Sequence, residues 1–336
     1  MKIAYLMDPL ESIQPENETT SHLMYESNER GHTIYFLEPH DVYIRKGQVV
    51  ARMRNISVQP GLGMEAYWQA IIRCAKQEHL VFETVADLDA LFLRSNPPLN
   101  YQTLEFLQAA NKHVFILNST TGQILGNSKL YTLNFPEIIP ETHVSRDPSR
   151  LRKIIDDFGG DMVVKPLQRF GGEGVIKVST RDRTNLNSLI HYYVRAYETY
   201  ARREPIMVQE YLKSVKKDGD VRILLLNGEI IGAMRRKPKR GDFRTNVHAG
   251  GQVHAHRVTA RERRICETIK DKLIADGLYF VGIDIIAGRL VEINCVSPGG
   301  IPRINRLNNV RLECKVIDFI ERRVDAIKHP SQRKRA

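Results

Sequence analysis

The chain has few cysteines and no long apolar segment. Its four cysteines, Cys74, Cys266, Cys295 and Cys314, are scattered without C-x-x-C spacing, which argues against a zinc site or a disulfide framework and fits a reducing compartment. No stretch reaches the ~20 apolar residues of a membrane-spanning helix, and the apolar run at the N-terminus is too short for a signal peptide. We therefore expect a cytoplasmic protein with no membrane partner.

Two phosphate-binding motifs are also absent. The chain contains neither G-x-x-x-x-G-K-S/T nor a strand-bound G-x-G-x-x-G, which excludes a Walker-type loop and a dinucleotide-binding fingerprint. With 336 residues, of which 42% are hydrophobic and 26% charged, the chain has the composition of a folded protein large enough for two or three domains.

A formal net charge of +11 favours a polyanionic partner. Nucleic acid, acidic lipid, nucleotide phosphates and polycarboxylate substrates all meet this condition, and the sign of the charge does not choose among them. The basic run at residues 328–335 could contact nucleic acid, although basic runs at chain ends are more often solvated.

The first third of the chain has the order of an α/β domain. Two strand-like segments flank a helical segment within the first 37 residues, which predicts a parallel sheet with a right-handed crossover. Residues 41–54 resemble a hairpin appended to that sheet. Residues 88–93 form another buried strand that ends at Arg94, at the edge where open α/β sheets bind ligands. Arg94 is therefore a candidate for an anionic group, or else an ordinary loop arginine, and we place the end of the domain at residue 122.

Two lysines and a glycine-rich turn in the next segment indicate a phosphate clamp. Lys129 falls in the first turn of a predicted helix, where the helix dipole disfavours a cation unless an anion binds there too. Lys165 ends a strand and is followed by Gly171 and Gly172, whose backbone N–H groups can approach phosphate oxygens. Glycine-rich hairpin tips are usually only turns, but the two lysines favour phosphate.

A possible adenine site follows the clamp. An apolar strand ends in Gln209, Glu210, Tyr211 and Leu212, a composition in which backbone groups can read the base edge and apolar side chains can sandwich the ring. This signal is weak by itself. A basic loop at residues 235–244 comes next, and it holds too few aromatic residues for a nucleic-acid site. Its Pro and Gly flanks favour a lid that closes positive charge over an anionic substrate.

A predicted β-hairpin at residues 281–294 carries three oxygen-bearing side chains. Glu292 and Asn294 share one face of their strand, and Asp284 lies across the turn. Three such groups on a buried hairpin are costly unless a cation lies among them, and Mg²⁺ with phosphate oxygens is the usual occupant. The alternative is an exposed hairpin with scattered polar residues, but the phosphate clamp upstream favours a metal.

The order of these parts resembles the ATP-grasp superfamily, and nearly the whole chain looks like bacterial glutathione synthetases. The motifs that carry the resemblance are Arg94-x-x-Pro97-Pro98, Lys165-Pro166-Leu167, Gly171-Gly172, Lys217-Asp218-Gly219-Asp220-x-Arg222, Asn246-x-x-Ala249-Gly250-Gly251, Phe280-Val281-Gly282-x-Asp284 and Glu292-Ile293-Asn294-x-x-Ser297-Pro298. The resemblance implies an α/β fold. A doubly wound, parallel-sheet pre-ATP-grasp domain at residues 1–122 would precede an ATP-grasp fold of two α+β subdomains, a lid at 123–207 and a catalytic part at 208–330, with a basic tail at 331–336.

The resemblance also implies an ATP-dependent carboxylate–amine ligase that joins γ-glutamylcysteine and glycine through an acyl phosphate. It assigns ATP to Lys129, Lys165, Gly171, Gly172, Gln209, Glu210, Tyr211, Leu212 and Asp220, with Asp220 at the ribose. It assigns two Mg²⁺ ions, for which Mn²⁺ could substitute, to Asp284, Glu292 and Asn294. The charge of the substrate carboxylate and of the transferring phosphoryl group would be neutralised by Arg222, Arg236 and Arg244. Residues near the substrates would be Arg94, Asn246, Gly250, Gly251, Ser297 and Gly299.

Two departures from the family pattern lie on the substrate side. Ser95 and Asn96 stand where the family usually has Lys and Asp, and Gly299 and Gly300 stand where a threonine and a different small residue are usual. They leave a ligase for another amino acid or peptide pair as an alternative. A further alternative is a non-catalytic nucleotide- or nucleic-acid-binding protein, which the intact set of acidic and basic residues disfavours. The resemblance suggests a homo-oligomer, namely a tetramer.

Overall fold

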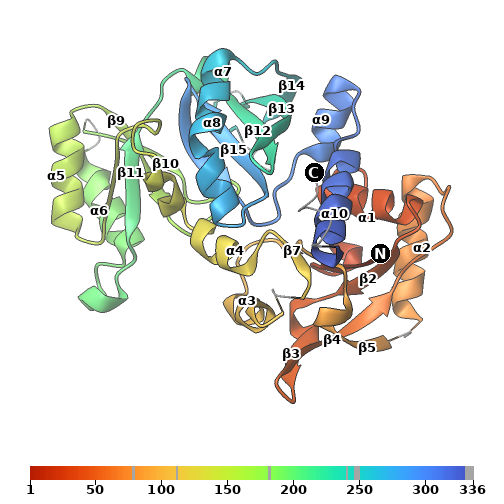
Figure 1. Ribbon diagram of the computed structural model, residues 1–336. Helices are drawn as coiled ribbons and strands as arrows, with labels where there is room; N and C mark the ends of the chain where they lie inside the picture. The colour runs from red at the N-terminus through yellow and green to blue at the C-terminus, as the bar shows by residue number, and fades with distance from the viewer. Residues whose placement is uncertain (78–79, 111–112, 181–182, 240, 246–249, 330–336) are drawn as a thin grey trace.

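A computed structural model describes residues 1–77, 80–110, 113–180, 183–239, 241–245 and 250–329 (Figure 1). Three sheets follow one another along the chain: a mixed N-terminal sheet, a four-stranded lid sheet and a five-stranded central sheet. In Figure 1 the lid sheet lies at one end of the molecule, the N-terminal sheet lies at the other, and the central sheet lies between them. No helix in the described ranges is long and apolar enough to cross a membrane.

The N-terminal sheet has a parallel centre. Its four parallel strands, in the order β2-β1-β6-β7, are β2 (Thr33–Leu37), β1 (Lys2–Leu6), β6 (Ala90–Leu93) and β7 (Phe115–Leu117). Helix α1 (Thr19–Glu29) connects β1 to β2, as the sequence predicts. Tyr5 of β1 stacks on Phe92 of β6 with ring centroids 4.7 Å apart. These strands are buried on both faces, which explains their nearly continuous apolar sequences.

The rest of this sheet is antiparallel. Its three strands are β3 (Val42–Arg45), β4 (Gln48–Asn55) and β5 (Leu80–Thr84), and β4 pairs with β2, β3 and β5. The appended hairpin is therefore confirmed, whereas the expectation of a parallel sheet holds only for the central strands. The helical segments of this region are η1 (Leu10–Ser12), η2 (Pro39–Asp41), α2 (Met64–Lys76), η3 (Val85–Asp87) and α3 (Tyr101–Gln108).

The lid sheet is antiparallel throughout, with the order β10-β9-β11-β8. Its elements are β8 (Thr142–Ser145), α5 (Pro148–Phe158), β9 (Asp161–Pro166), β10 (Ile176–Ser179), α6 (Arg183–Val194), η5 (Tyr200–Arg202) and β11 (Ile206–Glu210). Both helices pack apolar residues against the sheet. Helix α6 ends at Val194, because Arg195 has a left-handed backbone with φ 54°.

The central sheet has the order β14-β13-β12-β15-β16 and is also antiparallel. Its elements are α7 (Val215–Asp218), β12 (Asp220–Leu226), β13 (Glu229–Lys237), β14 (Gln252–Ala255), α8 (Ala260–Ala275), β15 (Phe280–Ile286) and β16 (Arg289–Asn294). Asn227-Gly228 and Ala287-Gly288 close its two hairpins with positive φ at both residues, the geometry of a tight hairpin turn. The first part of the predicted basic loop, residues 235–237, belongs to β13 instead.

The last helices return to the N-terminal domain. Helices α9 (Ile301–Asn308) and α10 (Leu312–Lys328) follow the central sheet, and Val316, Ile317 and Ile320 of α10 share a core with residues of α1. Figure 1 shows α10 beside α1. Between the N-terminal sheet and the lid lie α4 (Thr120–Gly126) and η4 (Lys129–Asn134). The predicted boundary at residue 122 falls inside α4, and the division into domains stays a prediction.

Candidate functional site

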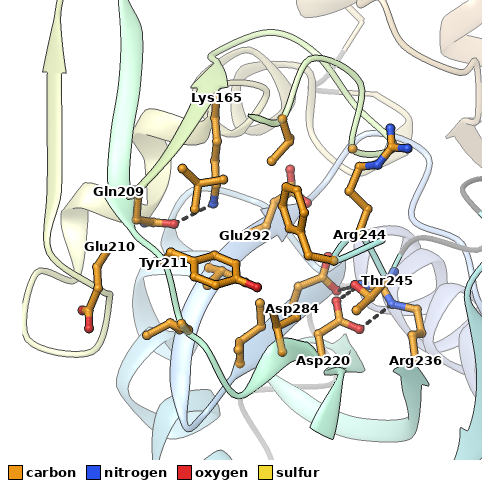
Figure 2. Close-up of a pocket in the computed structure, with 18 of the residues that line it drawn as sticks. Lys165, Gln209, Glu210, Tyr211, Asp220, Arg236, Arg244, Thr245, Asp284 and Glu292 are labelled. Carbon is orange, nitrogen blue, oxygen red and sulfur yellow. Dashed lines mark hydrogen bonds and ion pairs between the residues drawn. The ribbon is translucent and has the colours of Figure 1, made fainter. Parts of the chain in front are cut away.

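One pocket lies where the lid sheet faces the central sheet (Figure 2). Its lining residues are Lys129, Val163, Lys165, Gly172, Val175, Gln209, Glu210, Tyr211, Leu212, Val215, Asp220, Arg236, Phe243, Arg244, Thr245, Asp284, Ile286, Val291 and Glu292. All the residues that the sequence assigns to ATP are among them except Gly171. The lining comes from both sheets and from the segment after β13, so the fold brings together residues more than 160 positions apart.

Two lysines from different elements, η4 and β9, line this pocket. Lys165, at the end of β9, donates from Nζ to Gln209 Oε1 at 2.6 Å. Burial lowers the pKa of Lys165 to about 8, since no carboxylate of the described residues lies within ion-pair distance of it to offset the lost hydration. Lys129, the first residue of η4, donates from Nζ to the carbonyl of Arg169 and lies 3.7 Å from Glu292 Oε1. Lys165 thus has a neutral acceptor, which leaves its charge available to an anion, whereas Lys129 also has the Glu292 carboxylate nearby.

Gln209 uses its side-chain amide within the lid sheet. Its side chain is buried and bridges Lys165 to Thr142, donating from Nε2 to Thr142 Oγ1 at 2.8 Å. The structure therefore places this amide behind Lys165. The neighbouring amides of Glu210 and Tyr211 donate to the carbonyls of Glu141 and Asp161 at 2.9 and 3.0 Å. The Leu212 N–H has no acceptor among the described residues.

An apolar wall completes the pocket. Val163, Tyr211 and Val215 form a small buried cluster, with Val175, Phe243 and Ile286 packed on it. Phe243 meets the ring of Tyr211 edge-on, with centroids 5.8 Å apart and an angle of 88°. Of these six residues, sequence reasoning assigned only Tyr211 to the site. A signal was available for Val163, because it lies two residues before Lys165 on β9 and so shares its face.

Asp284 and Glu292 lie opposite each other on β15 and β16. Asn294 Nδ2 donates to Asp284 Oδ2 at 3.3 Å, so the three predicted metal-binding residues do lie together. Their surroundings differ. Asp284 is buried and engaged by arginines, whereas Glu292 is partly exposed and faces Lys129. The two carboxylates are thus neighbours with unequal freedom to bind a ligand.

The sequence predicts that Arg222, Arg236 and Arg244 neutralise substrate charge. Arg222 contacts both oxygens of Asp284, with Nε–Oδ1 2.5 Å and Nη2–Oδ2 2.8 Å. Arg236 Nη2 lies 2.9 Å from Asp284 Oδ1, and its Nε donates to Asp220 Oδ1 at 2.9 Å (Figure 2). Burial alone would raise the pKa of Asp284, but Arg222 and Arg236 hold it well below its usual range.

Arg244 is the most exposed of the three arginines. It lines the pocket, but its closest partner is Asp242 on the same segment, at 2.8 Å. Arg222 does not line the pocket. The structure thus separates the three: Arg222 and Arg236 form a buried cluster with Asp220 and Asp284, and Arg244 remains at the edge of the pocket.

The donor set around the hairpin fits a magnesium ion unevenly. Carboxylate and amide oxygens are the ligands that Mg²⁺ accepts, and Asp284, Glu292 and Asn294 supply them from adjacent positions. Glu292 is the least committed of the three, because both oxygens of Asp284 already face guanidinium groups. A metal here would be held chiefly by Glu292 and Asn294, with Asp284 contributing.

The predicted substrate residues that the structure describes lie outside the pocket lining. Arg94 is fully buried, and burial lowers its pKa to about 10. Its guanidinium donates to Thr20 Oγ1 at 3.0 Å and to the carbonyl of Pro298 at 3.2 Å, while Ser297 Oγ donates to the backbone carbonyl of Arg94 at 3.1 Å. Gly299 O accepts from Arg222 Nη1 at 3.5 Å. Arg94 therefore ties the N-terminal sheet to the loop before α9.

The remaining substrate candidates belong to the segment between β13 and β14. Gly250 and Gly251 precede β14 and do not line the pocket, and Asn246 lies outside the described residues. Thr245, which the sequence did not single out, is buried and does line it.

An antiparallel lid sheet and a central sheet with a lysine-lined pocket between them define an ATP-grasp fold. Solved structures agree on this fold. D-cycloserine synthetase superposes with a TM-score of 0.64 at 12% identity, covering 95% of this chain and 100% of that one. The ATP-grasp ligase PsnB, complexed with minimal precursor, Mg and ADP, gives a TM-score of 0.60 at 16% identity and covers 96% and 98% of the two chains.

Sequence comparison identifies the family. The model of the N-terminal domain of prokaryotic glutathione synthetase matches residues 1–122, and that of its ATP-grasp domain matches residues 128–309. The glutathione synthetase of Synechocystis sp. is 37% identical over 326 residues, 96% of this chain and 99% of the relative. That of Thermosynechococcus vestitus is 38% identical, covering 95% and 99%. The chain belongs to the prokaryotic glutathione synthetase family and is an ATP-using ligase that forms C–N bonds.

Proposed function

We propose that this ligase makes glutathione from γ-glutamylcysteine and glycine, with ATP converted to ADP and phosphate. The observation that carries the proposal is the gathering of Lys129, Lys165 and Glu292 around one pocket, in a chain that matches glutathione synthetases over nearly its whole length. Two cations and a carboxylate at that place suit a nucleotide phosphate and its metal.

The pocket suggests where each part of ATP lies. The adenine ring fits the apolar wall of Val163, Tyr211 and Val215, and the Leu212 N–H is the donor left to read its edge. The phosphates fit between Lys129 and Lys165, beside the glycine turn. In this arrangement Gln209 positions Lys165 and does not touch the base. The Asp220 carboxylate accepts from Arg236, so a ribose hydroxyl would have to bind the same carboxylate beside Arg236.

The chemistry needs two substitutions. A carboxylate oxygen of γ-glutamylcysteine attacks the γ-phosphorus, and the bond from that phosphorus to the ADP oxygen breaks. The glycine amine then attacks the acyl carbon, phosphate leaves, and the amine loses a proton to give the amide. The protein's own groups bind, orient and neutralise charge and exclude water, which is where most phosphoryl-transfer catalysis lies.

Magnesium is part of this proposal. When bound, it would neutralise charge on the phosphates, and Glu292, Asn294 and Asp284 are the residues that would hold it. A cytoplasmic location and a homo-oligomeric state, namely a tetramer, are proposed on the family resemblance alone.

The test measures ADP release from the purified full-length protein with Mg²⁺ and ATP. We expect turnover only when γ-glutamylcysteine and glycine are both present, with glutathione identified by mass spectrometry. Omitting either substrate is the control. No stimulation of ADP release by the pair would reject this substrate assignment.

A ligase for a larger acceptor is the second candidate. A Cβ atom built at Gly299 meets no atom within 4 Å, so the loop before α9 borders open space. Ser95 and Asn96 also lack the charges usual in the family. A screen of amino acids in place of glycine distinguishes the two candidates, because a larger acceptor with a higher kcat/KM than glycine would favour the second.

A further inference from the structure

Arg303 is a half-buried arginine whose side chain forms no hydrogen bond or ion pair with any residue the structure describes. It lies in the first turn of α9, three residues after Gly300. Helix α9 packs against β13 and β14, the strands beside the buried arginine cluster, and Figure 1 shows it at that side of the central sheet. A half-buried guanidinium without a partner gives up hydration and receives nothing in return.

The charges around Arg303 make this more costly. Burial lowers the pKa of Arg303; Glu18 opposes this shift, and Arg306 and Arg236 add to it. Glu18 is the acidic residue that most favours the charged form of Arg303, yet Glu18 and Arg303 form no ion pair. An anion bound beside Arg303 would relieve both the lost hydration and the repulsion from Arg236.

The other arginines nearby are already satisfied. Arg94 donates to Thr20 and Pro298, Arg222 and Arg236 share Asp284, and Arg306 donates to the carbonyl of Glu16 at 2.9 Å and to Asn17 Oδ1 at 3.1 Å. Arg303 is thus the one arginine of this group, within the described ranges, whose fork has no protein acceptor. The loop directly before it carries Gly299, which borders open space.

We propose that Arg303 determines substrate specificity by binding a substrate carboxylate other than the one that receives the phosphoryl group. This rests on the proposed function, in which two such carboxylates exist: the α-carboxylate of the γ-glutamyl residue and the carboxylate of glycine. Both present the same planar group, which a guanidinium can bind through two parallel hydrogen bonds. Arg303 thus takes the anion-binding role that was expected of Arg94, and Arg94 becomes a positioning residue for the loop.

The test compares Arg303→Gln, Arg303→Lys and Arg306→Gln by steady-state kinetics with each substrate varied in turn. Arg306→Gln is the matched control. It removes a cation from the same helix, and that cation already has protein acceptors, Glu16 and Asn17. We expect Arg303→Gln to raise KM for one of the two carboxylate substrates by roughly 30-fold or more, to leave KM for ATP within about twofold, and to lower kcat by less than about threefold. Arg303→Lys should recover part of the loss, and Arg306→Gln should change no KM more than about twofold.

Substrate analogues then assign the carboxylate. Glycinamide replaces glycine in one arm, and a dipeptide with its glutamyl α-carboxylate converted to an amide replaces γ-glutamylcysteine in the other. In the wild type one of these amides should lose affinity by the same factor as the Arg303→Gln change, and in Arg303→Gln that acid and its amide should bind alike. Urea unfolding of each variant checks that the fold is kept.

Two results would overturn the inference: both KM values of Arg303→Gln within about twofold of wild type, or wild-type discrimination between acid and amide that persists in the variant. A wild-type protein that releases no ADP with the pair contradicts the proposed function instead. The two failures are therefore distinguishable.

Discussion

Lys165 in the pocket and the two arginines of the buried cluster are held in opposite ways. Lys165 rests on the neutral amide oxygen of Gln209 at 2.6 Å, whereas Arg222 and Arg236 face the carboxylates of Asp284 and Asp220. A neutral partner leaves a lysine's charge uncompensated, which an anionic ligand can use. A carboxylate partner cancels the charge and fixes the geometry.

The difference indicates that Lys165 serves ligand binding and that the arginine cluster serves stability. Lys165 keeps an uncompensated positive charge that a ligand can use, while the ion pairs of the cluster join β12, β13 and β15. Asp284 stands in both regions, because it pairs with the arginines and also contacts Asn294 beside Glu292. Variants on either side of this division should therefore fail in different measurements.

The largest expected effect is on stability. Asp284→Asn should lower the free energy of unfolding by about 3–5 kcal/mol, because it leaves Arg222 buried without its carboxylate and removes one of the two partners of Arg236. Urea unfolding without nucleotide or metal measures this. Asp242→Asn is the control, since the more exposed pair of Asp242 with Arg244 should cost less than about 1 kcal/mol. Equal losses in the two variants would contradict the idea of a structural frame.

Glu292→Gln should affect activity strongly and stability little. It removes a carboxylate whose nearest cation is Lys129 at 3.7 Å, so stability should change by less than about 1 kcal/mol. The kcat for ADP release should fall on the order of 10²- to 10³-fold, because the charge that orients metal and phosphate is lost. A variant that unfolds as readily as Asp284→Asn while it keeps activity would erase the distinction between the two carboxylates.

Local signals in the sequence predicted much of this arrangement. Asn227-Gly228 marks its hairpin by turn chemistry, and Asp284 and Glu292 follow from the alternation of a strand pair. Most of the apolar wall has no such signal: strand alternation could place Val163 beside Lys165, but Val215 looks like an ordinary core residue until the lid faces the central sheet. The arginine partners of Asp284 depend on the register of β12 against β15, which joins residues 62 positions apart. No local pattern encodes that pairing.

Arg94 shows the same limit from the other side. Its place at the end of a buried strand suggested a ligand contact, but its acceptor is the carbonyl of Pro298, 204 residues away. The sequence predicts that Arg94 lies at the end of strand β6. Its hydrogen-bond partner, however, depends on where α9 and α10 return to the N-terminal domain.

Gln209→Glu gives Lys165 a carboxylate partner, like those of Arg222 and Arg236. The new charge should compensate the lysine and repel phosphate, so KM for ATP should rise about tenfold or more with stability unchanged or higher. Gln209→Leu is the control: it removes the acceptor without adding charge, and its KM should rise less. An ATP affinity that survives Gln209→Glu would mean that Lys165 does not meet the nucleotide.

The smallest effect should come from pH. Burial lowers the pKa of Lys165 to about 8 in the folded protein, below the value of an exposed lysine. Between these two pKa values the unfolded chain binds more protons than the folded one, so this lysine's contribution to stability increases as pH rises through that window. ATP binding should change in the opposite direction, because the neutral amine no longer attracts phosphate. The Kd for ATP, measured by calorimetry, should rise up to about tenfold between pH 7 and 9. Arg222 and Arg236 stay charged over this range, so Lys165→Arg should largely abolish the trend, and a trend of equal size in that variant would assign it to another group.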